Sequence, residues 1–427
     1  GAADYERALQ DRAQRRDDPL GLYVHVPFCR TICWYCACNK IGTKHQEQSA
    51  PYLEAVLREL SLVVDRIGRG HRVSHLHFGG GTPTFMPDSE LARLIGAFRD
   101  AFDFADDDHG EYSIEVDPRT VDASRLRVLR DLGMNRVSLG VQDFDPDVQK
   151  AVNRIQPKEL TIALIDAARD CGFRSVNVDL IYGLPRQTLE GFDRTLDTVI
   201  DARPDRLAIY GYAHMPRLFK AQRQIHEEDL PDAEGKLALL ELAVQRLGDA
   251  GYEYIGMDHF ALPGDELARA RREGGLHRNF MGYTTHAQTD LVGLGVSAIS
   301  HVGDSYVQNH RDLPAWEAAV DQGRLPLWRG LVMGTDDVLR AELIQRLMCQ
   351  GEIDTRQVER AWGIDFGRYF ADALAALRPL QEDGLVQCPP GRIRVTPRGR
   401  ALLRIIAMCF DRYLDQRGEG VRYSRTI

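Results

Sequence analysis

The hydrophobic positions of the chain alternate between two spacings over most of its length. Short runs rich in β-branched and aromatic residues predict buried strands, and longer stretches with apolar residues every three or four positions predict amphipathic helices. The predicted strands are Leu22–Val26, Val73–Phe78, Tyr112–Val116, Arg136–Val141, Ser175–Ile181 and Arg206–Tyr210, with a further one at Tyr252–Met257. The predicted helices are Tyr52–Ile67, Asp88–Phe102, Ala123–Asp131, Glu159–Cys171, Leu189–Ala202 and Ala233–Ala250. This alternation is typical of βα units around a parallel sheet.

Six or seven such units fall short of a closed eight-stranded barrel, so an open, partial barrel competes with a doubly wound sheet. The positions of the polar residues favour the barrel. Side chains or turns suited to binding follow or end the strands at Gly79–Gly81, Glu115, Gln142, Asp179 and Tyr212. In a βα barrel these positions meet at the carboxyl ends of the strands, where active sites are built. The predicted fold is therefore α/β, with a partial (β/α)6-type open TIM-like barrel.

The pattern changes near Leu325–Asp337, beyond which helices dominate. The stretch "GRIRVTPRGRALL" predicts a small hairpin followed by a helix, as in a winged-helix module. The predicted domains are an N-terminal helical segment over 1–20, the barrel over 21–330 and a mostly helical C-terminal domain over 331–427. Arginines on the predicted hairpin and helix could contact phosphates, but a solvated basic wing fits the acidic chain better.

The charge and hydropathy of the 427 residues narrow the possible partners. The formal net charge of −9 argues against a protein that binds nucleic acid. No run of about 18 apolar residues occurs, which predicts no membrane span, and the start of the chain lacks a hydrophobic signal core. We expect a cytoplasmic protein, and a monomer because no coiled-coil stretch is visible.

The segment "CRTICWYCACNK" places four cysteines within ten positions. Cys29, Cys33 and Cys36 follow a C-x3-C-x2-C spacing, and Cys38 comes two residues later. Zinc sites usually take two ligand pairs from separated segments, and disulfides at such short spacings would be strained. Three thiolates from one loop can instead bind three irons of a cubane cluster and leave the fourth iron without a protein ligand. The other four cysteines are single, and we expect reduced, mostly buried thiols.

This loop, placed just after a first strand, resembles the signature of the radical S-adenosylmethionine enzymes. The glycine run in "HFGGGTPT", His77 to Thr84, matches the second hallmark of that superfamily. The resemblance implies a [4Fe-4S] cluster whose open iron binds S-adenosylmethionine, and one-electron cleavage of that molecule to a 5′-deoxyadenosyl radical. Glycines Gly79, Gly80 and Gly81 would let the backbone approach the methionyl end of the ligand.

Further motifs, from Tyr23 to Leu414, resemble the oxygen-independent coproporphyrinogen III oxidase (coproporphyrinogen dehydrogenase) family. They are "LYVHVPFC", "CNK", "GGGTPT", "SIEVDPR", "LGVQDF", "VNRIQ", "NVDLIYGLPRQT", "YAHMP", "IGMDHFA", "LHRNFMGYTT", "GVSAIS" and "AMCFDRYL". The resemblance implies decarboxylation of two propionates of coproporphyrinogen III to vinyl groups, giving protoporphyrinogen IX in haem biosynthesis. It implies an electron donor such as a flavodoxin or ferredoxin. That family carries a segment ahead of the cysteine strand, so residues 1–20 are interpreted as truncated relative to it.

Two other functions remain as alternatives. A related branch of haem chaperones shares the barrel and three cysteines, but generally has an aromatic residue where this chain has Cys38. A regulator that binds nucleic acid through the C-terminal domain would show steep salt dependence. Cys38 counts against the first, and the net charge counts against the second.

The resemblance also implies roles for individual residues. Cys29, Cys33 and Cys36 would ligate the cluster, and Cys38 would be a catalytic residue near the site that does not bind iron. Two molecules of S-adenosylmethionine are implied, the first at Tyr23, Gly79, Glu115 and Ile299, and the second at Tyr35, Gly81, Thr82, Gln142, Arg154, Asp179 and Ala213. By position or charge alone, Arg30, Lys40, His45, Arg278 and Arg329 are candidates for binding the substrate propionates.

Overall fold

The computed structural model describes residues 1–105, 109–287 and 289–414. Its centre is a curved sheet of parallel strands in the spatial order β9-β8-β7-β6-β4-β1. These strands are β1 (Leu20–Val26), β4 (Arg72–Gly80), β6 (Glu111–Val116), β7 (Arg136–Gln142), β8 (Ser175–Tyr182) and β9 (Arg206–Gly211). Each lies beside the strand that precedes it in this series, as expected of successive right-handed βα units.

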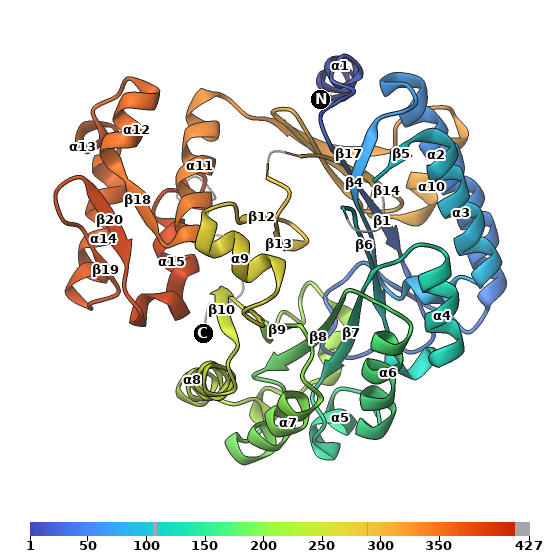
Figure 1. Ribbon diagram of the computed structural model, residues 1–427, viewed down its shortest axis with the longest axis horizontal. Coiled ribbons are helices and arrows are strands. Elements are labelled where there is room, and N and C mark those ends of the chain that lie inside the picture. The colour runs from blue at the N-terminus through green and yellow to red at the C-terminus, as the bar shows by residue number, and fades with distance from the viewer. Residues whose placement is uncertain (106–108, 288, 415–427) are drawn as a thin grey trace.

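The helices that connect these strands cover the outer face of the sheet (Figure 1). They are α2 (Ser49–Ile67), α3 (Asp88–Ala101), α4 (Ala123–Asp131), α5 (Pro146–Ala151), α6 (Lys158–Asp170), α7 (Leu189–Ala202) and α8 (Ala233–Asp249). Each long helix buries an apolar stripe, and side chains of Asp122, Thr188 and Asp232 cap the first turns of α4, α7 and α8. The predicted partial (β/α)6 barrel is confirmed, with strand and helix ends within a few residues of those predicted.

The sheet continues beyond the six parallel strands at both edges. β14 (Asp290–Leu294) lies parallel to β1, followed by antiparallel β15 (Ile299–Val302), β16 (Ser305–Asn309) and β17 (Leu327–Val332). At the other edge β11 (His259–Ala261) lies antiparallel to β9, and β10 (Glu253–Gly256) pairs with β11. The strand predicted at Tyr252–Met257 is therefore present, but outside β11. In the part of the chain that is described, the two edges do not pair, so the barrel stays open.

An ion network fills the amino end of the barrel interior, where β6, β7 and β9 begin. Glu111 lies 3.2 Å from Arg136, which also pairs with Glu266, and Arg206 lies 2.8 Å from Asp265. Although burial alone would raise it, the charges of Arg136 and Arg206 hold the pKa of Glu111 at about 2.

Several shorter elements complete the barrel domain. Helix α1 (Ala2–Ala13) packs on α2, and α10 (Leu313–Asp321) lies on the other side of α2. The middle of Figure 1 holds α9 (Glu266–Glu273) and the hairpin of β12 (His277–Asn279) and β13 (Gly282–Thr284). The predicted helical segment over 1–20 thus contains one helix and the start of β1, and β17 crosses the domain boundary predicted at residue 330.

The C-terminal domain has its own apolar core, which includes Leu343, Leu347, Phe370 and Phe410. Its helices are α11 (Thr335–Gln350), α12 (Thr355–Trp362), α13 (Phe366–Tyr369), α14 (Ala371–Glu382) and α15 (Leu403–Met408). β19 (Val386–Gln387) and β20 (Arg392–Val395) form a hairpin, of which only β20 lies in the stretch where one was predicted, and β18 (Glu352–Asp354) adds a third strand. Among the described residues, no helix is both long and apolar enough to cross a membrane.

Candidate active site

The cysteine loop leaves the barrel at the carboxyl end of β1. Its two ends are joined by a short parallel pair, β2 (Phe28–Cys29) and β3 (Ile41–Gly42), and Thr43 N donates to Cys29 O at 2.9 Å. Within the loop Cys36 N donates to Cys33 O at 3.2 Å, which folds the chain into a turn. The loop is therefore a closed unit that holds its thiols beside the ends of the parallel strands.

Each of the three predicted cluster ligands has a hydrogen-bond donor beside its sulfur. Thr82 Oγ1 lies 3.6 Å from Cys29 Sγ, and guanidinium nitrogens of Arg154 and Arg119 lie 3.4 and 3.6 Å from Cys33 Sγ. A hydrogen bond from the exposed Cys38, with the charge of Lys40, lowers the pKa of Cys36 to about 6. Burial raises the pKa of Cys29 to about 11. The same contact with Cys36 raises the pKa of Cys38.

The donors around these thiols suit the thiolate ligands of an iron–sulfur cluster. In such a cluster each thiolate binds a different iron. Iron ligation requires thiolates, which the guanidinium and hydroxyl donors around Cys29 and Cys33 stabilise. All four of the other cysteines are free, but only Cys349 is buried, so the prediction that most are buried was wrong.

The glycine turn lies directly against the base of this loop. Gly80 has a φ of +115°, and a Cβ there would lie 2.7 Å from the His25 ring. A Cβ on Gly81 would lie 2.7 Å from the carbonyl of Pro27, and Gly81 N donates to Val26 O at 2.7 Å. Only glycine allows this turn to pack so closely on the β1 segment that leads to the cysteines.

His25 connects the strand to the loop that follows it. Its Nε2 lies 2.8 Å from the carbonyl oxygen of Asn39, so Nε2 carries the proton, and Nδ1 then accepts from the Tyr23 hydroxyl at 3.0 Å. Tyr23 stacks on His77 with ring centroids 5.8 Å apart. Because Tyr23 pairs with Gly293 of β14, and the Ile299 backbone packs on Gly293, the predicted residues Tyr23 and Ile299 lie near each other.

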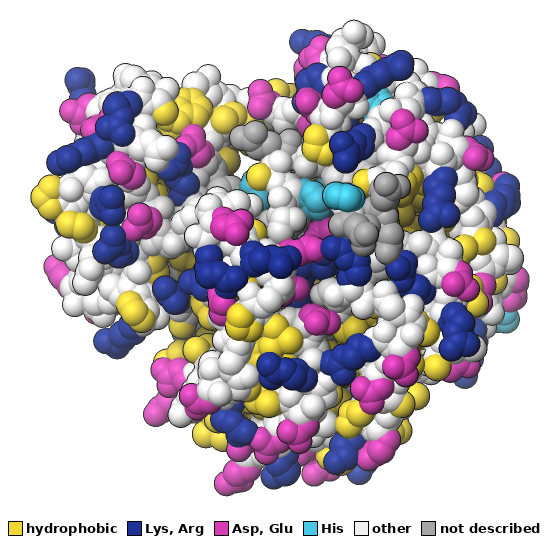
Figure 2. All heavy atoms as spheres, viewed as in Figure 1, with side chains coloured by type: hydrophobic (Ala, Val, Ile, Leu, Met, Phe, Trp, Pro, Cys, Tyr) yellow, Lys and Arg dark blue, Asp and Glu magenta, His cyan; other side chains and the backbone are white. Residues whose placement is uncertain are grey.

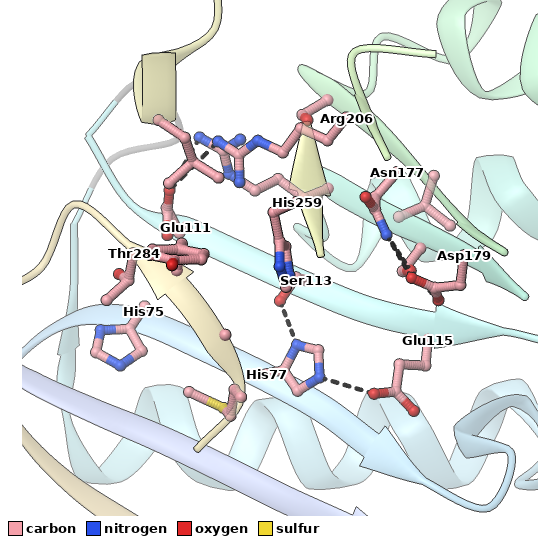
Figure 3. A pocket seen from close by; sticks show the side chains of 18 of the residues that line it. His75, His77, Glu111, Ser113, Glu115, Asn177, Asp179, Arg206, His259 and Thr284 are labelled. Atoms are coloured by element: carbon pink, nitrogen blue, oxygen red, sulfur yellow. Dashed lines mark hydrogen bonds and ion pairs between the residues drawn. The ribbon is translucent and has the colours of Figure 1, made fainter. Parts of the chain in front are cut away.

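Figure 3 shows the polar pocket inside the barrel. Glu115 of β6 accepts from Gly80 N at 3.1 Å and lies 3.3 Å from His77 Nε2. Asp179 of β8 accepts hydrogen bonds of 2.8 Å from both Ser138 and Asn177. Burial raises the pKa of Asp179 to about 6. The pocket encloses a space of about 930 Å³, including its open mouth. Glu115 and Asp179 both line it, as expected of residues predicted to hold a ligand.

Arg154 brings the second group of predicted residues to the cysteine loop. It is 6% exposed and lies 3.4 Å from Asp117, which also pairs with Arg119 at 2.6 Å. Burial opposes ionisation of Asp117, but the two arginines hold its pKa below the ordinary value. Gln142, at the end of β7, has a φ of +72°, and its side-chain nitrogen lies near Gly140 beside Arg154. Two guanidinium groups thus share one carboxylate and one thiol.

The side chain of Gln222 joins two more predicted positions. Its Nε2 donates to the carbonyl oxygens of Tyr35 and Ala213, at 2.9 and 3.1 Å. Tyr35 packs against the apolar cluster of Val148, Ile181 and Tyr212. The structure therefore brings Tyr35 and Ala213 to opposite sides of one buried amide.

The five candidates for propionate binding do not gather in one place. Lys40 donates to the carbonyl of Cys36 at 2.7 Å, and the exposed Arg30 lies over Phe85. His45 pairs with Glu47 on the surface, and Arg329 bonds Gln308 at the edge of the sheet. Arg278 is partly buried, and its Nε has no hydrogen-bond partner among the described residues.

Four residues near the thiols were not selected from the sequence. His25, Asp117 and Arg119 stand in the quoted motifs "LYVHVPFC" and "SIEVDPR", so the signal was present. Gln222 lies in no quoted motif, and only the fold brings it to the cysteine loop.

The open parallel barrel, the thiol loop after β1 and the glycine turn after β4 together define a class of enzymes. Residues 23–199 match the model of the Radical SAM superfamily, and residues 335–402 match that of the HemN C-terminal domain.

Relatives along the whole chain narrow this class. The oxygen-independent coproporphyrinogen III oxidase of Pseudomonas aeruginosa is 50% identical over all of this chain and 92% of its own. The enzyme of that name from Escherichia coli K12 is 48% identical over 98% of this chain and 91% of its own. A solved structure of coproporphyrinogen III oxidase (HemN) from Escherichia coli, described as a radical SAM enzyme, superimposes with a TM-score of 0.92. It is 47% identical and covers 97% of this chain and 94% of that one. The chain belongs to the oxygen-independent coproporphyrinogen III oxidase family.

Proposed function

We propose that this protein decarboxylates two propionates of coproporphyrinogen III to vinyl groups without oxygen, giving protoporphyrinogen IX in haem biosynthesis. It is a radical S-adenosylmethionine oxidoreductase. The observation that carries the proposal is the cysteine loop with cations on its thiols, held against the glycine turn in a chain 48–50% identical to enzymes of that name.

Each propionate loses a hydrogen atom, carbon dioxide and one electron as it becomes a vinyl group. The [4Fe-4S] cluster and S-adenosylmethionine supply, when bound, the one-electron chemistry that removes the hydrogen atom. The residues of this chain hold the reactants. Cys29, Cys33 and Cys36 would ligate the cluster, and the glycine turn leaves room for the methionyl end of the ligand.

Charged residues at the carboxyl ends of the strands would orient S-adenosylmethionine. Glu115 can accept from an ammonium group or a ribose hydroxyl, and Asp179 from a ribose hydroxyl. Arg154 can form a forked contact with a carboxylate. Since Glu115 and Asp179 arise from separate strands of one pocket, we propose that the site holds two molecules, the first at Tyr23, Gly79, Glu115 and Ile299. The second would contact Tyr35, Gly81, Thr82, Gln142, Arg154, Asp179 and Ala213, and Gly80 belongs to the glycine turn that leaves room for the ligand.

The remaining assignments are also proposals. Cys38, which is exposed and hydrogen-bonded to Cys36, would act in the site without binding iron. We expect a monomer in the cytoplasm, with a small one-electron carrier such as a flavodoxin or ferredoxin as donor. The domains would be 1–20, 21–330 and 331–427.

Anaerobic turnover tests the function. The protein is reconstituted with iron and sulfide and reduced, S-adenosylmethionine and coproporphyrinogen III are added, and 5′-deoxyadenosine and protoporphyrinogen are both assayed. Both products are expected. Formation of 5′-deoxyadenosine with stable haem binding and no porphyrin product would instead support the haem chaperone.

A further inference from the structure

A second cavity opens between the barrel and the C-terminal domain. The barrel side is formed by the carboxyl ends of β8 and β9 and by α8, and the other side by the 3-10 helix Arg398–Leu402 and α15. The charged and hydroxyl side chains that matter here are Tyr182, Tyr210, Lys236, Asp258, Arg400 and Arg404. We call this cavity the interdomain cleft. In the view of Figure 2, a row of Lys and Arg side chains crosses the middle of the molecule, beside the C-terminal domain at left.

The charges of the interdomain cleft do not balance. Lys236, Arg400 and Arg404 face a single carboxylate, that of Asp258. Lys236 Nζ donates to the carbonyl of Tyr212 at 3.1 Å, which leaves its charge unpaired. Neither arginine has an ion-pair partner among the described residues. An excess of cations in a chain of net charge −9 indicates a site for an anion.

Asp258 compensates little of this positive charge. Burial raises the pKa of Asp258, against the charges of Arg404 and Arg278. Arg278 therefore acts on the cleft from the β12 side, and its Nε is buried without a partner among the described residues. The cleft thus contains three cationic side chains and one carboxylate, and Arg278 adds a further positive charge near that carboxylate.

The interdomain cleft adjoins the pocket of Figure 3. Tyr210 lines both cavities, and Ala213, which also lines the cleft, lies next to the Gln222 amide that reaches the cysteine loop. A ligand whose reacting end lies near Glu115 and Asp179 can therefore extend past Tyr210 into the cleft. This geometry suits a large ligand with anionic groups on several sides.

We propose that the interdomain cleft binds the carboxylates of the substrate propionates that do not react, through Lys236, Arg400 and Arg404. This inference rests on the proposed function, because coproporphyrinogen carries four propionates and only two are decarboxylated. Guanidinium groups form two parallel hydrogen bonds with a carboxylate, so Arg400 and Arg404 fix the orientation of the macrocycle. The C-terminal domain is then part of the substrate site.

The test compares single and double variants with a matched control. Arg400→Gln and Arg404→Gln each remove a cleft cation, and Arg398→Gln removes the same charge from the same 3-10 helix outside the cleft. Loss of one charged hydrogen-bond partner should raise the KM for coproporphyrinogen III about tenfold, and loss of both more, with kcat nearly unchanged. Arg398→Gln should match the parent protein. If the cleft variants also match it, the inference is wrong.

A variant with the opposite expected change in KM separates loss of binding from damage to the fold. Asp258→Asn removes the one carboxylate of the cleft, and should lower the KM for coproporphyrinogen III by about threefold. A damaged fold would raise KM instead. An unchanged or higher KM in Asp258→Asn, with an unchanged melting temperature, would contradict the proposal.

Two further measurements separate this inference from the proposed function. Release of 5′-deoxyadenosine without porphyrinogen should be equal in all variants, because the cleft does not contact the thiols. Binding of coproporphyrinogen III, followed by protein fluorescence, should weaken in the cleft variants even if no vinyl product forms. If the parent protein makes no protoporphyrinogen, only the proposed function is wrong. If all variants bind coproporphyrinogen III equally well, only the proposal for the interdomain cleft is wrong.

Discussion

The two ends of the barrel interior both contain paired arginines, but they use them differently. At the amino end, Arg136, Arg174 and Arg206 face three carboxylates, those of Glu111, Asp265 and Glu266. At the carboxyl end, Arg119 and Arg154 share Asp117 alone, and both reach the sulfur of Cys33.

The difference separates structural charge from functional charge. At the amino end each arginine lies beside a carboxylate of the protein itself, so the charges balance without a ligand. At the carboxyl end two cations face one carboxylate, and a thiolate or an anionic ligand must complete the balance. An arginine that carries excess charge beside a thiol is therefore a better indicator of function than burial alone, which both pairs share.

The largest effect should come from removing a thiol at the carboxyl end. Cys33→Ala leaves Arg119 and Arg154 without their sulfur partner and removes one predicted ligand of the cluster. We expect the iron and sulfide content of the reconstituted protein to fall, and 5′-deoxyadenosine formation to drop to background. Cys171→Ala, at a single thiol far along the chain, is the control and should keep both. Full activity in Cys33→Ala would contradict the assignment.

At the amino end, removing a cation should damage stability and leave the chemistry intact. Arg206→Met leaves the buried carboxylate of Asp265 without its cation and removes one of the positive charges beside Glu111. This should lower the free energy of unfolding by about 3–5 kcal/mol. Urea unfolding measures this loss. The rate of 5′-deoxyadenosine formation per folded molecule should remain within about threefold of the parent rate. A large loss of rate without loss of stability would assign a catalytic role to this end as well.

Much of this comparison was visible in the sequence. The six parallel strands and their helices follow from periodicity, because each buries one face or stripe. Gln142 ends β7 and Glu115 is the last residue but one of β6, as predicted, whereas Asp179 lies inside β8, three residues before the strand ends.

Other features depend on contacts between distant segments. The strands β14 to β17 are short and carry no helix between most of them, so no βα spacing indicated that β14 would pair with β1. The interdomain cleft combines Lys236 of α8 with Arg400 and Arg404, more than 160 positions away. These charges are visible in the sequence, but a charged side chain is expected to be solvated unless the fold places it beside other groups.

The next prediction concerns Arg154, at the carboxyl end of the barrel. Arg154→Met should reduce activity less than Cys33→Ala does, and should reduce stability less than Arg206→Met does. Asp117 keeps its pairing with Arg119 at 2.6 Å, so the free energy of unfolding should fall by only about 1 kcal/mol. The kcat/KM for S-adenosylmethionine should fall about a hundredfold, because a forked contact with an anion is lost. Arg154→Lys, which restores the charge without the fork, should recover part of that loss. Equal activities of the Met and Lys variants would show that geometry at Arg154 does not matter.

The smallest effect concerns two carboxylates whose pKa values are shifted in opposite directions. The pKa of Asp179 is raised from 3.8 to about 6, so the folded protein binds its proton more tightly than the unfolded chain. Stability should therefore increase by about 2 kcal/mol as the pH falls from about 6 to 4. Asp179→Asn should abolish this gain, as measured by urea unfolding at several pH values.

Glu111 provides the contrast, because its pKa is lowered from 4.5 to about 2. Its contribution is fully present above pH 4.5 and is lost as the pH falls toward 2, so Glu111→Gln should destabilise the protein equally at pH 5 and pH 7. If Asp179→Asn and Glu111→Gln gave the same pH dependence between 4 and 6, the two ends of the barrel would not differ in how their charges are balanced. Opposite dependences would mean that burial disfavours the charged form of Asp179, whereas the arginines favour the charged form of Glu111.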